Sequence, residues 1–180
     1  NINASQWLAL AALIERKYEY YDGFVICHGT DTMAYTASMA TFMLENINLP
    51  VVFTGSQLPL ADFLSDAPSN LRTAFAMAAS GKPGVFLAFD RKIMLGCRAV
   101  KVRASGFSAF ESINSHYVGR VTAMGLELDE TMLTALNERY QLLLSVLDAE
   151  PEVEITYFVP DERKSGGAYR TVSGVVKKAD

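Results

Sequence analysis

The feature that most constrains the fold of this chain is an apolar run that ends abruptly in a polar turn. Residues 23–27 (GFVIC) have the composition of a strand, and they stop at His28-Gly29. Thr30 and Asp31 follow directly, where a helix is expected to begin. Strand-to-helix turns of this kind lie at the carboxyl edge of parallel α/β sheets, where ligands usually bind. The alternative is that Thr30 and Asp31 only cap the helix.

The amino-terminal two thirds of the chain alternate between helical and strand patterns. This alternation predicts an α/β fold with a doubly wound, largely parallel sheet. The loops at residues 28–32 and 54–60 follow successive strands, so we expect them to meet at one edge of that sheet. The expected helices cover residues 5–18, 32–46 and 68–79, and the expected strands cover 24–27, 51–54 and 85–89, followed by extended chain over 93–104.

The first expected helix has an amphipathic pattern. We expect five residues on or near its buried stripe, namely Trp7, Leu8, Ala11, Leu13 and Ile14.

The cysteines and histidines indicate neither a disulfide nor a metal site. Cys27 and Cys97 lie in apolar surroundings, and we expect both to be buried free thiols in a reducing compartment. His28 and His116 have no metal-ligand spacing with each other or with the cysteines. We therefore expect no metal and no other cofactor.

The net charge of −4 and the pI near 5.2 argue against a nucleic-acid partner and an anionic membrane surface. The longest apolar stretches are far below the ~20 residues of a membrane span. No basic and apolar leader is seen at the amino end, so we expect a cytoplasmic protein.

Four ordered segments of this chain resemble the L-asparaginase family, and the closest likeness is to the bacterial cytoplasmic type. The first is the strand that leads into His-Gly-Thr-Asp-Thr-Met at residues 28–33. The resemblance as a whole covers residues 1–115. The others are residues 49–60 (LPVVFTGSQLPL), Ser65-Asp66 with Asn70-Leu71 and Ala74, and residues 96–104 (GCRAVKVRA) with Phe107, Phe110 and Asn114.

The resemblance implies hydrolysis of L-asparagine to L-aspartate and ammonia. Thr30, Asp31 and Lys101 would form a catalytic group, in which the Thr30 hydroxyl carries proton transfer or water activation. Asp31 would also bind the α-amino group of the substrate, and Ser56 would offer its backbone carbonyl to the substrate amide. A homo-oligomer is implied for the complete protein.

Several of these residues also have simpler interpretations. Lys101 is flanked by Val100 and Val102, so strand alternation alone makes it an exposed lysine on the opposite face. Asp66 and Asn70 are interpreted as residues of a helix start and its packing rather than as catalytic groups. Tyr35 is expected to pack near the site as part of a helix.

The chain also departs from the family pattern. The Thr-Gly-Gly-Thr segment, the Asp-Ser pair expected just before Asn1 and the smaller carboxyl-terminal domain have no counterpart here. We therefore expect an amino-terminally truncated asparaginase domain with half of an active site and poor activity. The alternatives are a non-catalytic amino-acid-binding module and a protein-interaction module.

The pattern changes after Asn114, and we place a junction between residues 114 and 126. Residues 127–147 are predicted to form a long helix, and residues 153–158 and 168–176 are predicted to form two strands joined by a polar turn. This 116–180 segment has a weak resemblance to the YolD-like proteins, which implies contact with a DNA-repair protein.

Overall fold

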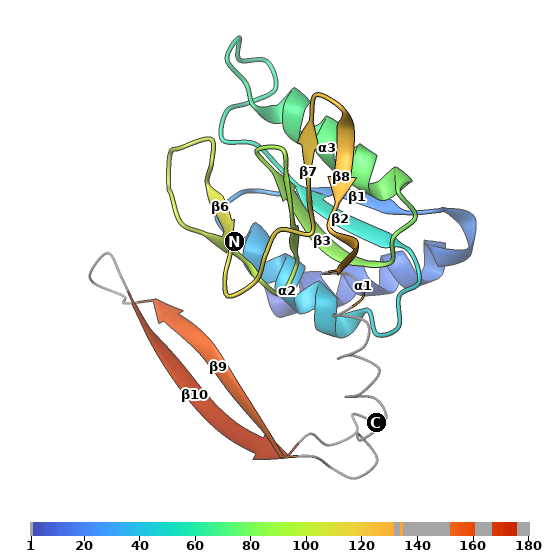
Figure 1. Cartoon of the computed structure of the whole chain (residues 1–180). Coiled ribbons are helices and arrows are strands. Elements are labelled where there is room, and N and C mark those ends of the chain that lie inside the picture. Colours follow the sequence, from blue (N-terminus) through green and yellow to red (C-terminus); the bar gives the residue numbers. More distant parts are fainter. Residues whose placement is uncertain (1, 132–133, 135–151, 161–166, 176–180) are drawn as a thin grey trace. The chain divides into compact units, whose positions relative to one another are not determined.

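A computed structural model describes residues 2–131, 134, 152–160 and 167–175 (Figure 1). The chain divides into two compact units, Asn1–Met132 and Leu133–Asp180, and each is described by itself.

The first unit is built on a six-stranded sheet in the order β1-β2-β3-β4-β7-β8. Its helices are α1 (Ala4–Lys17), the short 3-10 helix η1 (Tyr18–Tyr20), α2 (Met33–Met43) and α3 (Ala67–Ala79). Its strands are β1 (Phe24–Cys27), β2 (Pro50–Thr54), β3 (Gly84–Phe89), β4 (Lys92–Leu95), β7 (Gly119–Thr122) and β8 (Gly125–Leu128), and a separate two-stranded ladder joins β5 (Ala99–Lys101) to β6 (Phe110–Ser112).

The predicted α/β fold with a parallel core is confirmed. Strands β1, β2 and β3 pair in parallel, and β4, β7 and β8 extend the sheet by antiparallel pairing. The sheet thus continues through β7 and β8 as far as Leu128, across the whole of the junction expected between residues 114 and 126.

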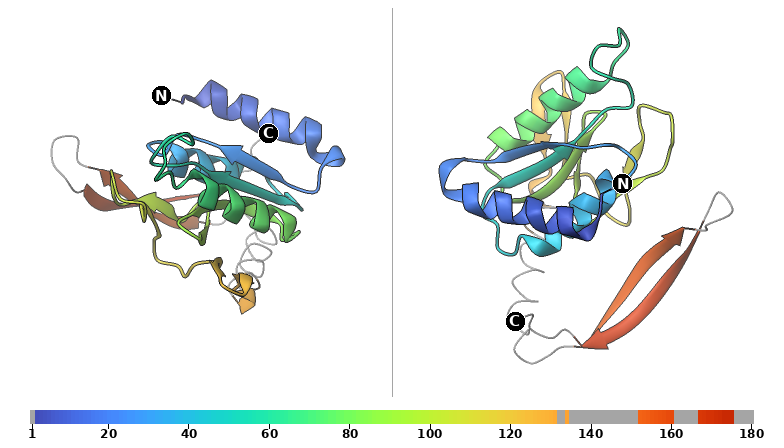
Figure 2. Two further views of the ribbon diagram at one scale, coloured as in Figure 1. Left: turned by 90° about the horizontal axis from the view of Figure 1, so that it is seen from above. Right: turned by 180° about the vertical axis from the view of Figure 1, so that it is seen from behind.

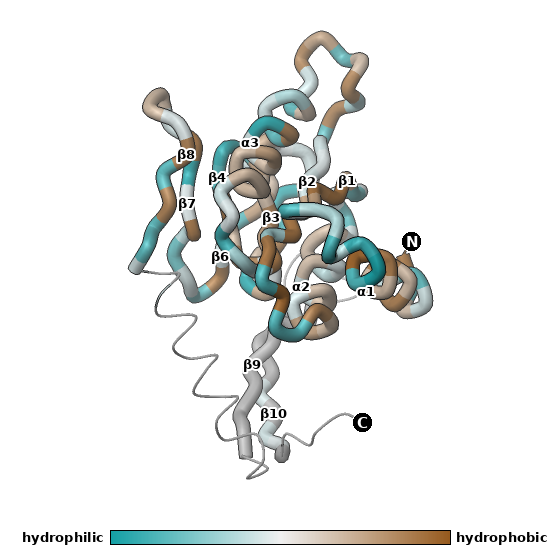
Figure 3. Tube along the Cα trace, turned by 90° about the vertical axis from the view of Figure 1, so that its right-hand side faces the viewer, coloured by the Kyte–Doolittle hydropathy of each residue, from teal (hydrophilic) through white to brown (hydrophobic). Residues whose placement is uncertain are grey.

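Helices cover both faces of the sheet, which makes three layers (Figure 2). On one face, Val85 and Leu87 are buried in a core shared with Ile14 of α1 and Met33 of α2. Phe86 alternates with these residues and is buried on the other face, where α3 packs against β2 and β3. Figure 3 shows hydrophobic stretches along these central strands, as expected for strands buried on both sides.

Helix α1 begins with a capping box, in which the Asn3 side chain accepts from Gln6 N and the Gln6 side chain accepts from Asn3 N. Ala11 and Ile14 are buried as predicted. The burial predicted for Leu8 and Leu13 is wrong, because these side chains are 62% and 45% exposed. Helix α1 packs against α2, so its buried stripe is narrow.

Both cysteines are free thiols, but the predicted burial of Cys27 is wrong. Cys27 is exposed because β1 is an edge strand of the sheet. Cys97 is only partly buried, and desolvation still raises the pKa of its thiol.

The helix predicted over residues 127–147 begins too early, because Glu127 and Leu128 belong to β8. The half-buried Leu126 and Leu128 alternate with exposed neighbours, which is the period of a strand. Residues 132–133 and 135–147 of that prediction lie outside the described residues.

In the second unit, β9 (Glu152–Pro160) and β10 (Gly167–Val175) form an antiparallel hairpin. The two predicted strands are therefore confirmed over their described residues. They form a two-stranded sheet of their own.

Candidate active site

The first two strand-to-helix loops begin side by side, as predicted. In the parallel ladder Cys27 pairs with Thr54, and His28 N continues it by donating to Thr54 O at 2.8 Å. Gly55 then passes so close to the His28 carbonyl oxygen that an added Cβ would overlap that atom. Only glycine allows this approach of the two backbones without a shift in one of them.

Lys101 lies at the centre of the candidate site. Its ammonium Nζ donates to Thr30 Oγ1 at 2.8 Å and to Asp31 Oδ1 at 2.7 Å. Its strand β5 is held by the ladder with β6, in which Lys101 pairs with the buried Phe110. The predicted contact is therefore present. The interpretation of Lys101 as a solvent-exposed lysine is wrong, because only 17% of its side chain is exposed.

Strand alternation places Lys101 on the face opposite to Val100 and Val102. This face looks toward the Thr30–Asp31 loop rather than toward open solvent. Val102, by contrast, is an exposed side chain.

Thr30 and Asp31 do not cap helix α2. The helix has Thr32 as its N-cap residue, and no side chain makes a capping hydrogen bond there. The polar groups of Thr30 and Asp31 are instead directed to Lys101. The interpretation of this pair as a helix cap is therefore wrong.

Asp31 combines a strong local contact with high exposure. Its carboxylate is 92% exposed, and the Lys101 hydrogen bond and charge hold the pKa of Asp31 below its usual range. Only Oδ1 has a hydrogen bond among the described residues, so Oδ2 faces solvent and can accept from a ligand. Lys101 also has a third N–H beyond the two that Thr30 and Asp31 accept.

The loop that carries Ser56 is held by its own polar contacts. The Asp66 carboxylate accepts from Gln57 N at 3.0 Å and from Leu58 N at 3.1 Å. The buried Asn70 donates to Gly55 O at 3.0 Å and to Asp66 Oδ2 at 2.9 Å. Asp66 and Asn70 belong to the start of α3, as predicted, and they also shape the loop beside Ser56.

A chain of hydrogen bonds that the sequence pattern did not predict joins α1 and α2 to the first loop. His28 Nδ1 lies 2.8 Å from Gly29 O, which can only accept, so Nδ1 carries the hydrogen. In the neutral imidazole His28 Nε2 is then an acceptor, and the Thr36 hydroxyl donates to it at 2.9 Å. Trp7 Nε1 donates to the same hydroxyl at 2.9 Å. The helical pattern predicts Trp7 only as part of an apolar stripe. Tyr35, expected to pack near the site, is an exposed residue of α2.

A second polar cluster supports the β5–β6 ladder. Tyr117 donates its hydroxyl to Glu111, and Arg103 donates to Ser108 O at 2.7 Å and to Glu111 at 3.3 Å. The bond to Tyr117 lowers the pKa of Glu111, while burial and Glu111 raise the pKa of Tyr117 to about 12. This cluster ties β6 to the segment that follows Lys101.

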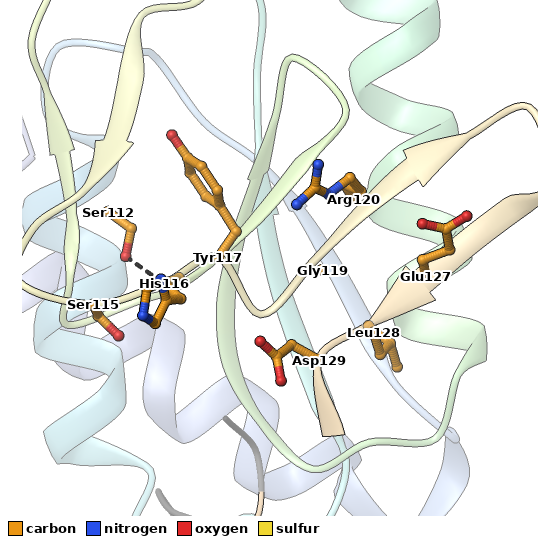
Figure 4. Close-up of a pocket in the computed structure, with 9 residues that line it drawn as sticks. All are labelled: Ser112, Ser115, His116, Tyr117, Gly119, Arg120, Glu127, Leu128 and Asp129. Atoms are coloured by element: carbon orange, nitrogen blue, oxygen red, sulfur yellow. Dashed lines mark hydrogen bonds between the residues drawn. The ribbon is translucent and has the colours of Figure 1, made fainter. Parts of the chain in front are cut away.

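A recess of about 380 Å³ lies beside β7 and β8 and is lined by residues that include His116, Tyr117, Arg120 and Glu127 (Figure 4). Thr30, Asp31 and Lys101 do not line it. Within the described part of the chain, no three His, Cys, Asp or Glu side chains gather as a possible metal site. In that same part, no helix is long and apolar enough to cross a membrane.

The model of the family "Asparaginase, N-terminal" matches residues 1–133. The chain therefore belongs to the asparaginase family.

Relatives in this family include the L-asparaginase of Thermococcus kodakarensis, which is 50% identical over 113 residues, or 63% of this chain and 34% of the relative. L-asparaginase 1 of Escherichia coli K12 is 48% identical over 115 residues, with the same shares of the two chains. This asparaginase-family chain thus spans about a third of the length of these curated relatives.

Solved structures of the family agree with this fold. The thermostable L-asparaginase from Thermococcus kodakarensis superposes with a TM-score of 0.69 at 45% identity, over 71% of this chain and 39% of that one. A probable cytoplasmic L-asparaginase from Campylobacter jejuni gives a TM-score of 0.66 at 29% identity, over 72% and 41% of the two chains.

The polar chain from Trp7 to His28 yields a prediction about stability. Thr36→Val keeps the shape of the side chain but leaves Trp7 Nε1 and His28 Nε2 without their partner, so it should cost about 1–3 kcal/mol of unfolding free energy. Urea unfolding followed by the fluorescence of Trp7, the single tryptophan, measures this loss. Thr41→Val is the matched control, because the Thr41 hydroxyl donates only to Ala37 O within the same helix. Equal losses of unfolding free energy in the two variants would contradict a stabilising role for the hydrogen bonds that join Trp7, Thr36 and His28.

The Lys101–Asp31 contact yields a prediction about titration. Lys101 lowers the pKa of Asp31, so the contact stabilises the fold above the usual Asp range and this contribution is lost as pH falls through the lowered pKa. Lys101→Met should raise the pKa of Asp31 toward its usual value, as measured by the carboxyl 13C shift. Lys82→Met makes the same charge change at a lysine that pairs with Glu130, and it should leave Asp31 unaltered. An unchanged Asp31 titration in Lys101→Met would show that the contact does not form in solution.

Proposed function

We propose that this chain carries an asparaginase-type amidohydrolase site that converts L-asparagine to L-aspartate and ammonia through Thr30, Asp31 and Lys101. The observation that carries the proposal is the single ammonium of Lys101 in contact with both a hydroxyl and a carboxylate. The names of the T. kodakarensis and E. coli relatives support the choice of reaction and substrate.

Amide hydrolysis requires a nucleophile, a path for protons and stabilisation of the oxyanion. Water adds to the side-chain carbonyl carbon, the carbon–nitrogen bond breaks, and the nitrogen leaves as ammonia after it takes up a proton. The hydroxyl of Thr30 orients or activates the attacking group, and Lys101 exchanges protons with that hydroxyl over 2.8 Å. Asp31 keeps the lysine in place through its Oδ1.

The substrate is held by groups next to this relay. The exposed carboxylate of Asp31 suits the α-ammonium group of an amino acid, and such charged hydrogen bonds contribute about 1.5–3 kcal/mol each. Ser56 lies on the adjacent loop, where its backbone carbonyl would accept from the substrate amide. These two assignments rest on the resemblance of both loops to the family motifs.

We propose low activity for the 180-residue chain by itself. It spans about a third of the length of its relatives, and Thr30, Asp31 and Lys101 supply one group of polar side chains. Loss of a member of a catalytic set commonly costs several orders of magnitude in rate. The alternative is a non-catalytic module that binds an amino acid through Asp31.

The role of Lys101 can be tested in a chimera in which this chain's aligned segment replaces its counterpart in the T. kodakarensis relative. Arginine keeps the positive charge but does not release a proton near neutral pH. Lys101→Arg should therefore lower ammonia release from L-asparagine by about 10²–10⁴-fold, the range of proton-transfer catalysis. Lys82→Arg is the matched control and should retain the rate.

Two outcomes of this assay would contradict the proposal. Full activity in Lys101→Arg would make Lys101 an electrostatic anchor only. Calorimetric binding of L-asparagine to a chimera that releases no ammonia would favour the amino-acid-binding module.

Assembly and location extend the proposal. We propose a cytoplasmic protein, in line with the cytoplasmic location named for the C. jejuni relative, and a homo-oligomer in the complete protein. We also propose that the second unit contacts a partner, such as the repair protein suggested by the YolD-like resemblance.

Exposed apolar side chains support self-association of the first unit. Phe63 is 99% exposed, and Leu60 and Leu64 beside it are also exposed. Light scattering of the 180-residue chain should give a mass above the 19.7 kDa of one copy, and Phe63→Ser should lower it. A mass of one copy at high concentration would contradict self-association through this loop.

A further inference from the structure

Gln57, in the second loop, makes three side-chain hydrogen bonds to the candidate site and its surroundings. The Gln57 side chain accepts from Thr30 Oγ1 through Oε1 at 3.1 Å. Its Nε2 donates to Ala104 O at 3.0 Å and to Gly106 O at 3.0 Å. One amide thus joins the Thr30 loop, its own loop and the segment that follows Lys101.

These contacts determine which way the amide is turned. Backbone carbonyl oxygens only accept, so the two donors on Nε2 must face Ala104 and Gly106. A flipped amide would set Oε1 against two oxygens. Oε1 therefore faces Thr30, and the Thr30 hydroxyl must donate its hydrogen to Gln57. The lone pairs of Thr30 Oγ1 remain for the ammonium of Lys101.

The same amide also restrains the strand that carries Lys101. Ala104 and Gly106 follow Lys101 by three and five residues, in a turn that returns to β6. This turn is closed by Val102 N and Arg103 N, which share Ala109 O at 2.8 and 3.3 Å. The Gln57 side chain bonds this turn to the second loop. The Asp66 carboxylate accepts from the backbone N–H of Gln57 and so fixes its position.

We propose that Gln57 is a positioning residue that sets the direction of the hydrogen-bonded chain from Lys101 through Thr30 and anchors the turn after Lys101. The catalytic part of this inference rests on the proposed amidohydrolase function. Gln57 acts through Thr30 and Lys101, and its anchoring of the turn does not depend on any reaction.

The test compares two substitutions at Gln57 in the 180-residue chain. Gln57→Leu removes all three side-chain hydrogen bonds, whereas Gln57→Glu keeps an acceptor for Thr30 and loses both donors. Gln6→Glu is the matched control. Gln6 is the N3 residue of the capping box of α1, a position that either Gln or Glu can fill.

Amide hydrogen exchange reads the anchoring directly. Both Gln57 variants should speed the exchange of Val102 and Arg103 about 10-fold, while the exchange of Ile26 of β1 should change much less. The Gln6→Glu control should match the unaltered chain at all of these amides. Unchanged exchange at Val102 in both variants would overturn the proposal.

Ammonia release in the same T. kodakarensis chimera tests whether Gln57 orients the hydrogen bonds from Lys101 through Thr30. Gln57→Leu should lower kcat about 10-fold with little change in KM, and Gln57→Glu should lower kcat less because Thr30 keeps its acceptor. Equal kcat in Gln57→Leu and the unaltered chimera would overturn the positioning role. If the unaltered chimera itself released no ammonia, the proposed function would fail, and the exchange experiment would still decide the anchoring.

Discussion

The parallel pairing of β1 with β2 is the constraint on which the candidate site depends. Its register, with Cys27 opposite Thr54, brings both loops out of the sheet at the same level. The hydrogen bond from His28 N to Thr54 O prolongs the ladder by one residue. A shift by one residue would turn every side chain of the strand to the other face of the sheet. Gly55 then lets the second loop lie against the first, so that the polar residues of both share one space.

Lys101 reaches this space from a distant part of the chain, 70 residues after Asp31. A long side chain loses rotamer entropy when it is fixed in one geometry, so its backbone must be well supported. The structure supplies three supports, which are the β5–β6 ladder, the contacts of Arg103 and Glu111, and the Gln57 amide. Such supports around contacting groups are what a preorganised site needs.

The buried polar side chains around the loops are paired. Thr54, Asn70 and Thr36 are buried, and each has a hydrogen-bond partner. Among the described residues, no buried side-chain nitrogen or oxygen is left without one. An unpaired group there would cost the full penalty of its desolvation. The layers are thus held by apolar packing, and the loops between them are held by directed polar contacts.

The sequence by itself determined the order of helices and strands from α1 to β3, because apolar periodicity and turn residues are local signals. It also indicated that the Thr30–Asp31 loop and the Ser56 loop share an edge, since parallel strands place their ends together. It misplaced Leu8, Leu13 and Cys27, whose exposure depends on what packs against α1 and on which strand lies at the sheet edge. The alternation of Leu126 and Leu128 was a strand signal that the long helical pattern concealed. Only the tertiary structure decided that the side chain of Lys101 points to the Thr30–Asp31 loop rather than to solvent. It also decided that Trp7, Thr36 and Gln57 make hydrogen bonds that support the two loops. These contacts join residues 27 to 71 positions apart, with the short exception of Thr36 and His28. A hydrogen bond across such a separation leaves no periodic trace in the chain, because its geometry exists only once the layers have packed.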